Sequence, residues 1–324
     1  MSNMLPDEDL KSLSDLLCIR DTDGRPALMI GLMAYFYFRE PWTRPVREAV
    51  TEIADEYLHQ FEGQLKWIRD HRSDRAPIYA IQKRRVALPR AWLPDNPDGQ
   101  EWGIGIHGGE SERAASDIQI QAFGGEYWGL NHKDDLGHLY FYYPLRWLAD
   151  HPGDFQQRVL HAAQRLKPFH GYAGVGFLEP VSLAAREQSC VLVTPLASRF
   201  PGIEVNAPIS HGLKCQHGIK GVNWLTILSD HFVEEAGGYD YLRIRLDEPN
   251  FPFYKYDGGL MIQAGPHPEV GDATQNRWPR HYVTLAKVLK KIQVKEHGGF
   301  HLGGPGLRMN KERAEAWLFR FDGK

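Results

Sequence analysis

Imidazole and thiol groups occur close together in the segment SHGLKCQHG. His211, Cys215 and His217 stand two to four residues apart, a spacing at which imidazole nitrogen and thiolate sulfur can share a zinc ion. A closed structural zinc site needs a fourth ligand, and none stands at a convincing distance in the sequence. We therefore expect these residues to lie in a surface loop, and we predict no metal and no other cofactor.

A glycine pattern offers a second kind of chemistry. Gly103, Gly105 and Gly108 fit the sequence G-x-G-x-x-G of dinucleotide-binding turns. In that motif the glycines follow a strand and open a helix, so that backbone amides meet a pyrophosphate. Here Ile104 and Ile106 alternate with the glycines, which indicates a closely packed strand and not a nucleotide site.

A third group is the segment HKDD at 132–135, where a histidine precedes two acids. A general base needs a histidine oriented by an acid, but neighbours in a polar loop do not face one another by default. We predict instead an exposed recognition loop over residues 124–137. The residues expected to contact a partner are Tyr127, Trp128, His132, Asp134 and Asp135.

Activated nucleophiles are not evident in the sequence. It contains neither the G-x-S-x-G elbow nor the G-x-x-x-x-G-K-[ST] loop. Cys190 lies in the apolar segment REQSCVLVTPL, which favours a buried structural thiol. A large chain without a visible catalytic set is typical of a protein that acts by binding, so we predict no enzymatic activity.

Hydrophobic periodicity indicates the elements that must position these groups. The run ALMIGLMAYFYF at 27–38 predicts a buried strand. Apolar residues at helical spacing after Val46 predict an amphipathic helix that Thr43 caps and Gly63 stops. The further elements expected in this half are strands at 102–107, 118–121 and 139–143 and a helix at 154–166.

The second half gives a similar mixture. The segment NWLTILSDHFVEE at 223–235 predicts a helix that ends at Gly237 and Gly238. The alternation in YDYLRIRL at 239–246 predicts a strand. The other elements expected are a strand at 260–264, a helix at 280–292 and a closing strand at 316–321.

These elements predict an α+β fold with mostly antiparallel sheets flanked by amphipathic helices, because closely spaced strands favour antiparallel pairing. We divide the chain into an acidic N-terminal segment, 1–25, and a main domain, 26–324. The segments IQIQAFGGE and MIQAGPHPE are loosely alike. Their likeness leaves open a division of the main domain into two similar lobes, 26–170 and 171–324.

Composition limits the class of protein. Hydrophobic residues make up 42% of the chain, which indicates a globular protein. The 38 basic and 41 acidic residues give a net charge of −3, so neither nucleic-acid binding nor nucleic-acid mimicry is favoured. The N-terminus is acidic, the longest apolar run is shorter than the about 20 residues of a membrane span, and the three cysteines are far apart. We predict a cytoplasmic protein without disulfides or membrane spans.

Residues 200–238, FPGIEVNAPISHGLKCQHGIKGVNWLTILSDHFVEEAGG, together with the earlier run LYFYYPLRWL, resemble the TsiV-type family of type VI secretion immunity proteins, formerly a domain of unknown function. The resemblance extends from about Leu28 to Phe321 and is sharpest in GIKGVNWLT at 218–226. This signature indicates membership of the family and not a catalytic activity, because the resemblance implies no catalytic residues for this chain. Within it we expect Asn223 to cap the following helix.

The resemblance implies a protein that protects its bacterium by binding a cognate effector toxin tightly. Because the chain shows no export signal, the toxin should act in the cytoplasm. A nuclease ranks first, ahead of toxins that attack nucleotides or lipids. The modest net charge favours steric blocking or distortion of the toxin over nucleic-acid mimicry. The oligomeric state is left open.

Two other functions stay open beside the immunity protein. A small-molecule enzyme on an α+β scaffold would use His107, His132 or His211. A structural component would assemble constitutively into a larger particle. The prediction that we carry forward is an immunity protein that inhibits a nuclease toxin without turnover and without direct contact to nucleic acid or membrane.

Overall fold

A single antiparallel sheet organises the computed structural model, which describes residues 5, 7–14, 16–69, 77–83, 86–126, 134–247, 249–301 and 304–324. Ten of its eleven described strands follow the order β10-β11-β9-β8-β2-β7-β6-β5-β3-β4, and the eleventh, β1, pairs with β2. Every pairing between these strands is antiparallel. The strands are β1 (Cys18–Arg20), β2 (Pro26–Phe38), β3 (Trp67–Arg69), β4 (Ile78–Ala80), β5 (Trp102–His107), β6 (Gln119–Gly124), β7 (Gly137–Tyr143), β8 (His170–Leu178), β9 (Leu225–Ser229), β10 (Phe253–Tyr256) and β11 (Gly259–Gln263).

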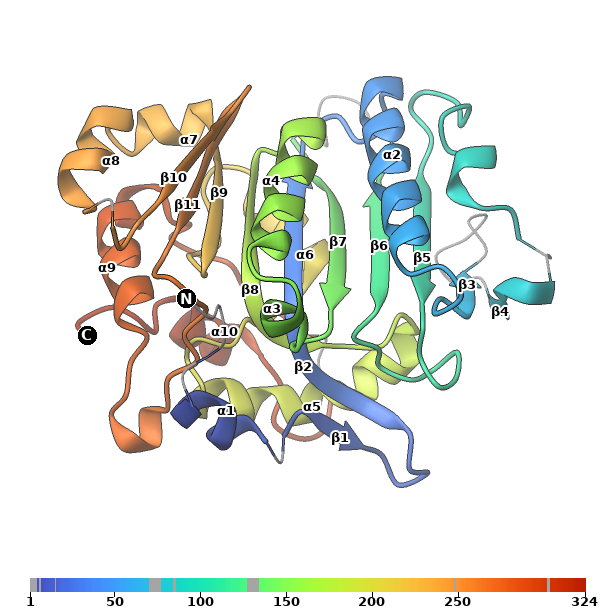
Figure 1. Cartoon of the computed structure of the whole chain (residues 1–324), viewed down its shortest axis with the longest axis horizontal. Helices are drawn as coiled ribbons and strands as arrows, with labels where there is room; N and C mark the ends of the chain where they lie inside the picture. Colours follow the sequence, from blue (N-terminus) through green and yellow to red (C-terminus); the bar gives the residue numbers. More distant parts are fainter. Residues whose placement is uncertain are drawn as a thin grey trace.

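Helices pack on both faces of this sheet. Two of them, α2 and α4, lie side by side over one face (Figure 1). On the opposite face His211 of α6 contacts Tyr37 of β2. The helices are α1 (Asp7–Leu13), α2 (Arg44–Gln60), α3 (Trp147–Asp150), α4 (Asp154–Leu166), α5 (Leu183–Arg199), α6 (Pro208–Lys214), α7 (Asp230–Glu235), α8 (Tyr239–Arg245), α9 (Arg280–Leu289) and α10 (Lys311–Leu318), with 3₁₀ turns at Ile81–Lys83, Pro89–Ala91, Ala273–Gln275 and Lys290–Ile292.

Strand β2 lies at the centre, between β7 and β8. Successive side chains of a strand point to opposite faces, so Phe36 faces α2 and α4, whereas Tyr35 and Tyr37 face α5 and α6. All three side chains are buried. Burial on both faces explains why this strand is an almost unbroken apolar run.

The predicted α+β class with a largely antiparallel sheet is confirmed. The strand expected at 27–38 is β2, and the helix expected after Thr43 is α2. The expected helix at 154–166 has the bounds of α4. Gly103 and Gly105 lie within β5, as the alternation with isoleucines predicts. None of the helices in the described part of the chain combines the length and apolar character that a bilayer span requires.

The expected helix at 223–235 is wrong in its first half. Residues 225–229 form β9, which pairs with β8 and β11, and only the segment from Asp230 is helical. Asn223 caps no helix, because a strand follows it; its side-chain oxygen accepts from Trp224 N–H at 2.7 Å, and its side-chain nitrogen donates to the Glu204 carboxylate at 2.8 Å. Residues 222–228 are all buried, and a run that is apolar all round fits a central strand as well as a helix.

The expected strand at 239–246 is also wrong, since residues 239–245 form α8 and Leu246 is its C-cap. Leu242 and Leu246 are buried, whereas Ile244 between them is 82% exposed. A strand would place all three side chains on one face, and only a helix separates them. The N-cap is Gly238, whose φ is +88°, so the preceding glycine pair starts this helix.

The expected closing strand at 316–321 is helical instead. Helix α10 covers its first three residues and ends at Leu318. The Asn310 side chain accepts a hydrogen bond from Arg313 N–H at 3.1 Å, which caps the helix start. Ala314, Trp317 and Leu318 are buried together at helical spacing, a pattern that the aromatic content of the segment obscures.

The domain division stays a prediction. The boundary expected at 170/171 falls within β8, a strand of the continuous sheet. The N-terminal segment contacts the C-terminal part of the chain, because the Asp9 carboxylate accepts a hydrogen bond from Val270 N–H at 3.1 Å and pairs with Arg277 at 3.0 Å.

Candidate functional site

Two acids of the predicted recognition loop lie directly before β7. Asp134 Oδ1 accepts a hydrogen bond from Arg39 Nη1 at 3.0 Å, and Asp135 Oδ1 accepts one from Gln216 Nε2 at 2.6 Å. Arg39 follows β2 and Gln216 follows α6, so both acids are held by ordered elements. The other predicted contact residues, Tyr127, Trp128 and His132, lie outside the described residues.

Helix α6 holds this end of the loop by a close backbone contact. Leu136 N–H donates to Gly212 O at 3.3 Å, and a Cβ on Gly212 would lie 2.7 Å from Leu136 O. Any larger residue there would push the helix away from the loop. Helix α6 also presents Ile209 and Leu213, which lie one turn apart and are 58% and 48% exposed. Adjacent exposed aliphatic side chains of this kind are candidates for contact with a partner.

A surface hollow of about 160 Å³, which we name the α6 hollow, opens between α6 and the loop. Most of its wall is apolar or aromatic. Its described lining includes three carboxylates and neither Lys nor Arg. The lining residues are Pro41, Trp42, Glu101, Phe123, Gly125, Glu126, Asp135, Leu136, His138, Ile209 and Leu213. Such a hollow suits a long cationic side chain, whose stem packs on the wall while its head meets the carboxylates.

The imidazole of His138 does not offset these acids. Burial, with a smaller contribution from Arg186, lowers the pKa of His138 to about 3. The ring is therefore neutral near pH 7 and stacks on Phe123 at 5.8 Å between ring centroids. A neutral, buried imidazole with so low a pKa is poorly matched to acid–base chemistry at neutral pH.

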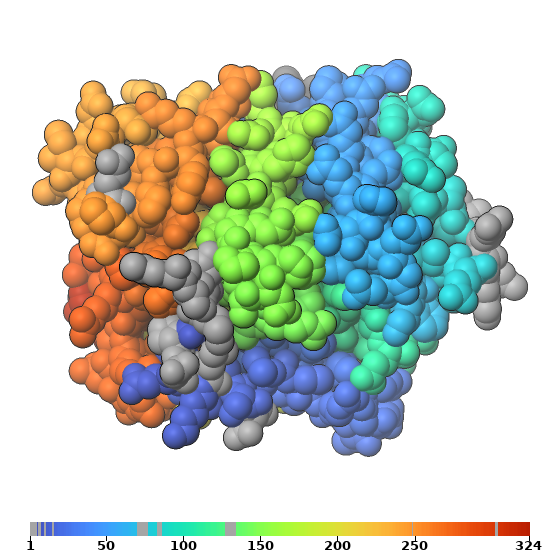
Figure 2. All heavy atoms as spheres, viewed as in Figure 1, coloured from blue at the N-terminus to red at the C-terminus, as the bar shows by residue number. Residues whose placement is uncertain are grey.

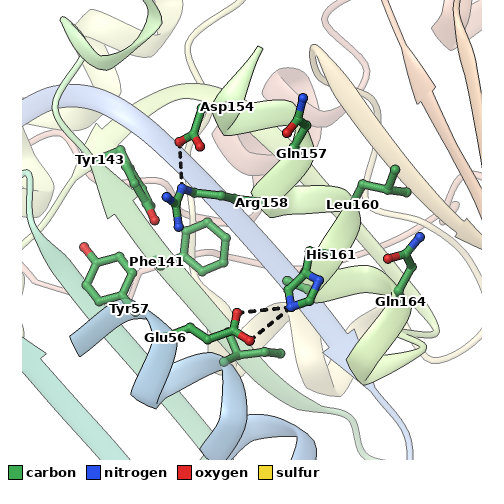
Figure 3. Close-up of a pocket in the computed structure, with 12 residues that line it drawn as sticks. Glu56, Tyr57, Phe141, Tyr143, Asp154, Gln157, Arg158, Leu160, His161 and Gln164 are labelled. Carbon is green, nitrogen blue, oxygen red and sulfur yellow. Dashed lines mark hydrogen bonds and ion pairs between the residues drawn. The ribbon is translucent and has the colours of Figure 1, made fainter. Parts of the chain in front are cut away.

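A larger hollow of about 380 Å³ lies between α2 and α4 on the other face of the sheet (Figure 3). In Figure 2 the blue atoms of α2 and the green atoms of α4 adjoin on this face. His161 Nε2 lies 3.1 Å from the Glu56 carboxylate, and Arg158 pairs with Asp154 at 2.6 Å. The aromatic floor consists of Tyr57, Phe141 and Tyr143.

The His161–Glu56 pair has the composition of a general base and its orienting acid. However, the described lining of this groove contains no Ser, Thr or Cys. The Tyr57 hydroxyl is engaged as well, because it donates to Tyr142 O at 2.5 Å and accepts from Gln119 N–H at 2.8 Å. The side chains of His161 and Glu56 are 43% and 51% exposed. The groove therefore offers room for a ligand without an assembled nucleophile.

The surface loop expected at His211, Cys215 and His217 is wrong for the first two residues, whereas His217 is exposed in a turn. His211 and Cys215 are buried. His211 Nδ1 lies 2.7 Å from His297 Nε2, and its Nε2 accepts from Ala207 N–H at 3.0 Å. Among the described residues, His211, Cys215 and His217 do not form a group of potential metal ligands. The partner of His211 is 86 residues away in sequence, too far for local spacing to indicate it.

Of the histidines of the enzyme alternative, His132 lies outside the described residues, and His211 is engaged as described above. His107 is buried in β5, its Nδ1 accepts from Gly109 N–H at 3.2 Å, and burial lowers its pKa to about 4. Cys190 is buried on α5, as its apolar flanks predict. The structure brings this thiol close to Glu179 and His301, a set of potential metal ligands that the sequence analysis missed.

The fold and site define an α+β protein with one large antiparallel sheet and an acid-rimmed surface hollow. A family model described as type VI immunity for VRR-NUC matches residues 49–321, and the chain belongs to this family. A solved structure, the Pseudomonas aeruginosa T6SS protein PA0821, resembles it with a TM-score of 0.87 and 28% identity, over 98% of this chain and 91% of that chain. No curated protein matches the chain.

Proposed function

We propose that this protein binds a type VI effector carrying a VRR-NUC nuclease and neutralises it in the cytoplasm without turnover. The family match supports the immunity role, and the α6 hollow carries the proposed mode of action. A nuclease surface that binds the phosphate backbone must present Lys and Arg side chains. The acidic rim of the hollow complements such a surface and disfavours direct binding of nucleic acid to the immunity protein.

The proposed interface combines apolar anchors with acids. Ile209 and Leu213 supply exposed apolar area, and Glu101, Glu126 and Asp135 supply the charge at the hollow. A stable inhibitor complex buries about 1,200–2,000 Å² in total, so the contact must extend beyond the hollow. We assign the rest to the recognition loop, with Tyr127, Trp128, His132, Asp134 and Asp135 as its contact residues. When the α6 hollow holds a basic side chain of the nuclease cleft, the bound immunity protein covers that cleft.

The sharpest test replaces one anchor. We expect Leu213→Glu to weaken effector binding by about 30-fold or more, because a central interface side chain contributes about 2 kcal/mol or more. Ile244→Glu on α8 is the matched control, since Ile244 is a similar aliphatic residue that is 82% exposed. Calorimetry with a catalytically inactive effector measures both affinities, and a growth assay with active effector measures protection.

Equal losses of affinity for Leu213→Glu and Ile244→Glu, or no loss for Leu213→Glu with its circular dichroism unchanged, would reject the α6 hollow as the interface.

The groove between α2 and α4 gives an independent test of action without turnover. The proposal would be contradicted if the purified protein, with no nuclease present, turned over a small molecule and His161→Ala abolished that turnover.

The loop needs its own experiment. We expect Trp128→Ala combined with Asp134→Ala to weaken effector binding by about tenfold, through loss of an aromatic anchor and a carboxylate. Glu234→Ala on α7 serves as a control for removal of a surface acid. An unchanged affinity would remove the loop from the interface while leaving the α6 hollow in place.

A further inference from the structure

Three potential metal ligands from distant parts of the chain meet beside α5. Glu179 directly follows β8, Cys190 lies within α5, and His301 precedes α10. One ligand atom from each, a carboxylate oxygen, the thiol sulfur and an imidazole nitrogen, all lie within 4.8 Å of one another. Glu179 and Cys190 are 5% and 1% exposed, and His301 is partly buried. None of the three residues lines the α6 hollow.

Two polar atoms of the cluster lack partners. Neither Glu179 Oε1 nor His301 Nε2 has a hydrogen-bond partner among the described residues, and both atoms are buried. A buried carboxylate oxygen or ring nitrogen without a partner is costly, and most such atoms in proteins are satisfied. Here both orphaned atoms belong to the same three-residue cluster.

The dimensions and chemistry of the cluster match a small divalent cation. Zinc binds carboxylate oxygen and imidazole nitrogen at about 2.0–2.2 Å and thiolate sulfur at about 2.3 Å, which puts two ligand atoms of one ion roughly 3.5 Å apart. Small side-chain rotations bring atoms within 4.8 Å to that spacing. A thiolate and a carboxylate also neutralise the two charges of the ion.

We propose that Glu179, Cys190 and His301 form a structural binding site for one Zn²⁺ ion, with a water molecule as the fourth ligand. The ion would tie the segment before α10 to α5 and to the end of β8. The same segment is already joined to α5 by Arg308, whose Nη1 lies 2.8 Å from the Glu187 carboxylate. Binding through Nε2 puts the proton of His301 on Nδ1, so the long 3.3 Å contact from Met309 N–H to Nδ1 gives way.

The test uses the full-length protein, Zn²⁺ and Co²⁺. We expect about one equivalent of tightly bound zinc, and we expect cobalt substitution to give the near-ultraviolet charge-transfer band of a thiolate ligand. Cys190→Ser should lower zinc affinity by about 100-fold or more and abolish the band. Cys18→Ser, which removes an exposed thiol on β1, is the matched control and should leave both unchanged.

His301→Gln and Glu179→Gln provide a second pair of variants that keep the thiol and the approximate side-chain volume. We expect each to lower zinc affinity by at least tenfold and to remove the rise in melting temperature that zinc gives the parent protein. Zinc below about 0.1 equivalent in the parent protein under saturating conditions, or equal affinity in the parent and the Cys190→Ser and His301→Gln variants, would overturn the site. Neither result bears on effector binding.

Discussion

The two faces of the central sheet are built from alternate residues of the same strands, yet they differ in chemistry. On the apolar face, under α2 and α4, one row across neighbouring strands consists of Ile106, Ile120, Phe141, Ala34, Ala173 and Leu225. On the hydroxyl face, under α5 and α6, the adjacent row consists of Gln121, Tyr140, Tyr35, Tyr172 and Thr226. The side chains of the first row pack by shape alone, and those of the second row also require hydrogen-bond partners.

The helices over the hydroxyl face supply those partners. Arg186 of α5 donates to the Tyr140 hydroxyl at 3.0 Å, and the Tyr172 hydroxyl donates to Asn206 Oδ1 at 2.6 Å, just before α6. Polar contacts of fixed geometry hold these elements more specifically than apolar packing does. Both the α6 hollow and the Glu179–Cys190–His301 cluster are built on elements of this face. The comparison therefore links the hydroxyl network to the positioning of the proposed sites.

The largest expected effect comes from the buried ion pair on the hydroxyl face. Lys220 and Glu204 are 1% and 2% exposed, and Lys220 Nζ lies 3.8 Å above the Tyr172 ring. Burial, partly offset by Glu204, lowers the pKa of Lys220 to about 8, so the amine stays charged at pH 7. Lys220→Met leaves Glu204 without its cation and should lower the free energy of unfolding by about 3–5 kcal/mol, measured by urea titration.

An apolar-face variant calibrates this result. Ile120→Val removes one buried methylene and should lower the free energy of unfolding by only about 0.5–1.5 kcal/mol.

The double variant Lys220→Met with Glu204→Leu should recover more than half of the stability lost in Lys220→Met, because no uncompensated charge remains. A double variant as unstable as Lys220→Met would show that the pair is needed for packing, and the proposed contrast between the faces would fail.

The sequence could predict elements whose burial is one-sided or whose length is distinctive. In α4, Phe155, Val159 and Ala163 recur at helical spacing with polar residues between them, and both helix bounds are correct. In β9, by contrast, tertiary contacts bury every residue from Leu225 to Leu228. Periodicity carries no information there, because strand and helix both present apolar side chains on all sides.

The candidate site was only partly predictable, because it is assembled from distant segments. The end of β2, the residues around β6 and β7, and α6 all contribute to the α6 hollow. A helix starting at Pro208 would place Ile209 and Leu213 on one side, but the sequence does not show which side faces solvent. That choice is made by the buried contact between His211 and His297, which joins residues far apart in the chain.

Acidification should lower the free energy of unfolding through the buried histidines of the hydroxyl face. His107, His138 and His170 all point to this face, and burial lowers their pKa values to about 4, about 3 and about 3. The unfolded chain binds a proton at each near pH 6.5 and the folded chain does not, so stability is full above pH 6.5 and falls as the pH drops toward the folded values. Each histidine should remove about 2 kcal/mol between pH 6.5 and pH 5.

Urea titrations at pH 7 and pH 5 measure this loss. In His170→Gln the difference between the two pH values should shrink by about 2 kcal/mol, because one proton-binding group is gone from the unfolded state. Ile120→Val, which removes no titratable group, is the control and should leave the difference unchanged. An equal pH dependence in the parent and His170→Gln would mean that His170 is protonated in the folded protein.

The smallest effect concerns a single hydroxyl pair. The hydroxyl oxygens of Tyr35 and Tyr142 lie 2.6 Å apart in the buried layer. Tyr35→Phe leaves the Tyr142 hydroxyl without this partner and should lower the free energy of unfolding by about 1 kcal/mol. Adding Tyr142→Phe removes both polar groups and should restore most of that stability, since two apolar rings replace a satisfied pair at little net change. If the double variant instead loses about twice as much as the single one, each hydroxyl contributes through other partners. In that case the hydroxyl face would be stabilised by an extended network and not by pairs.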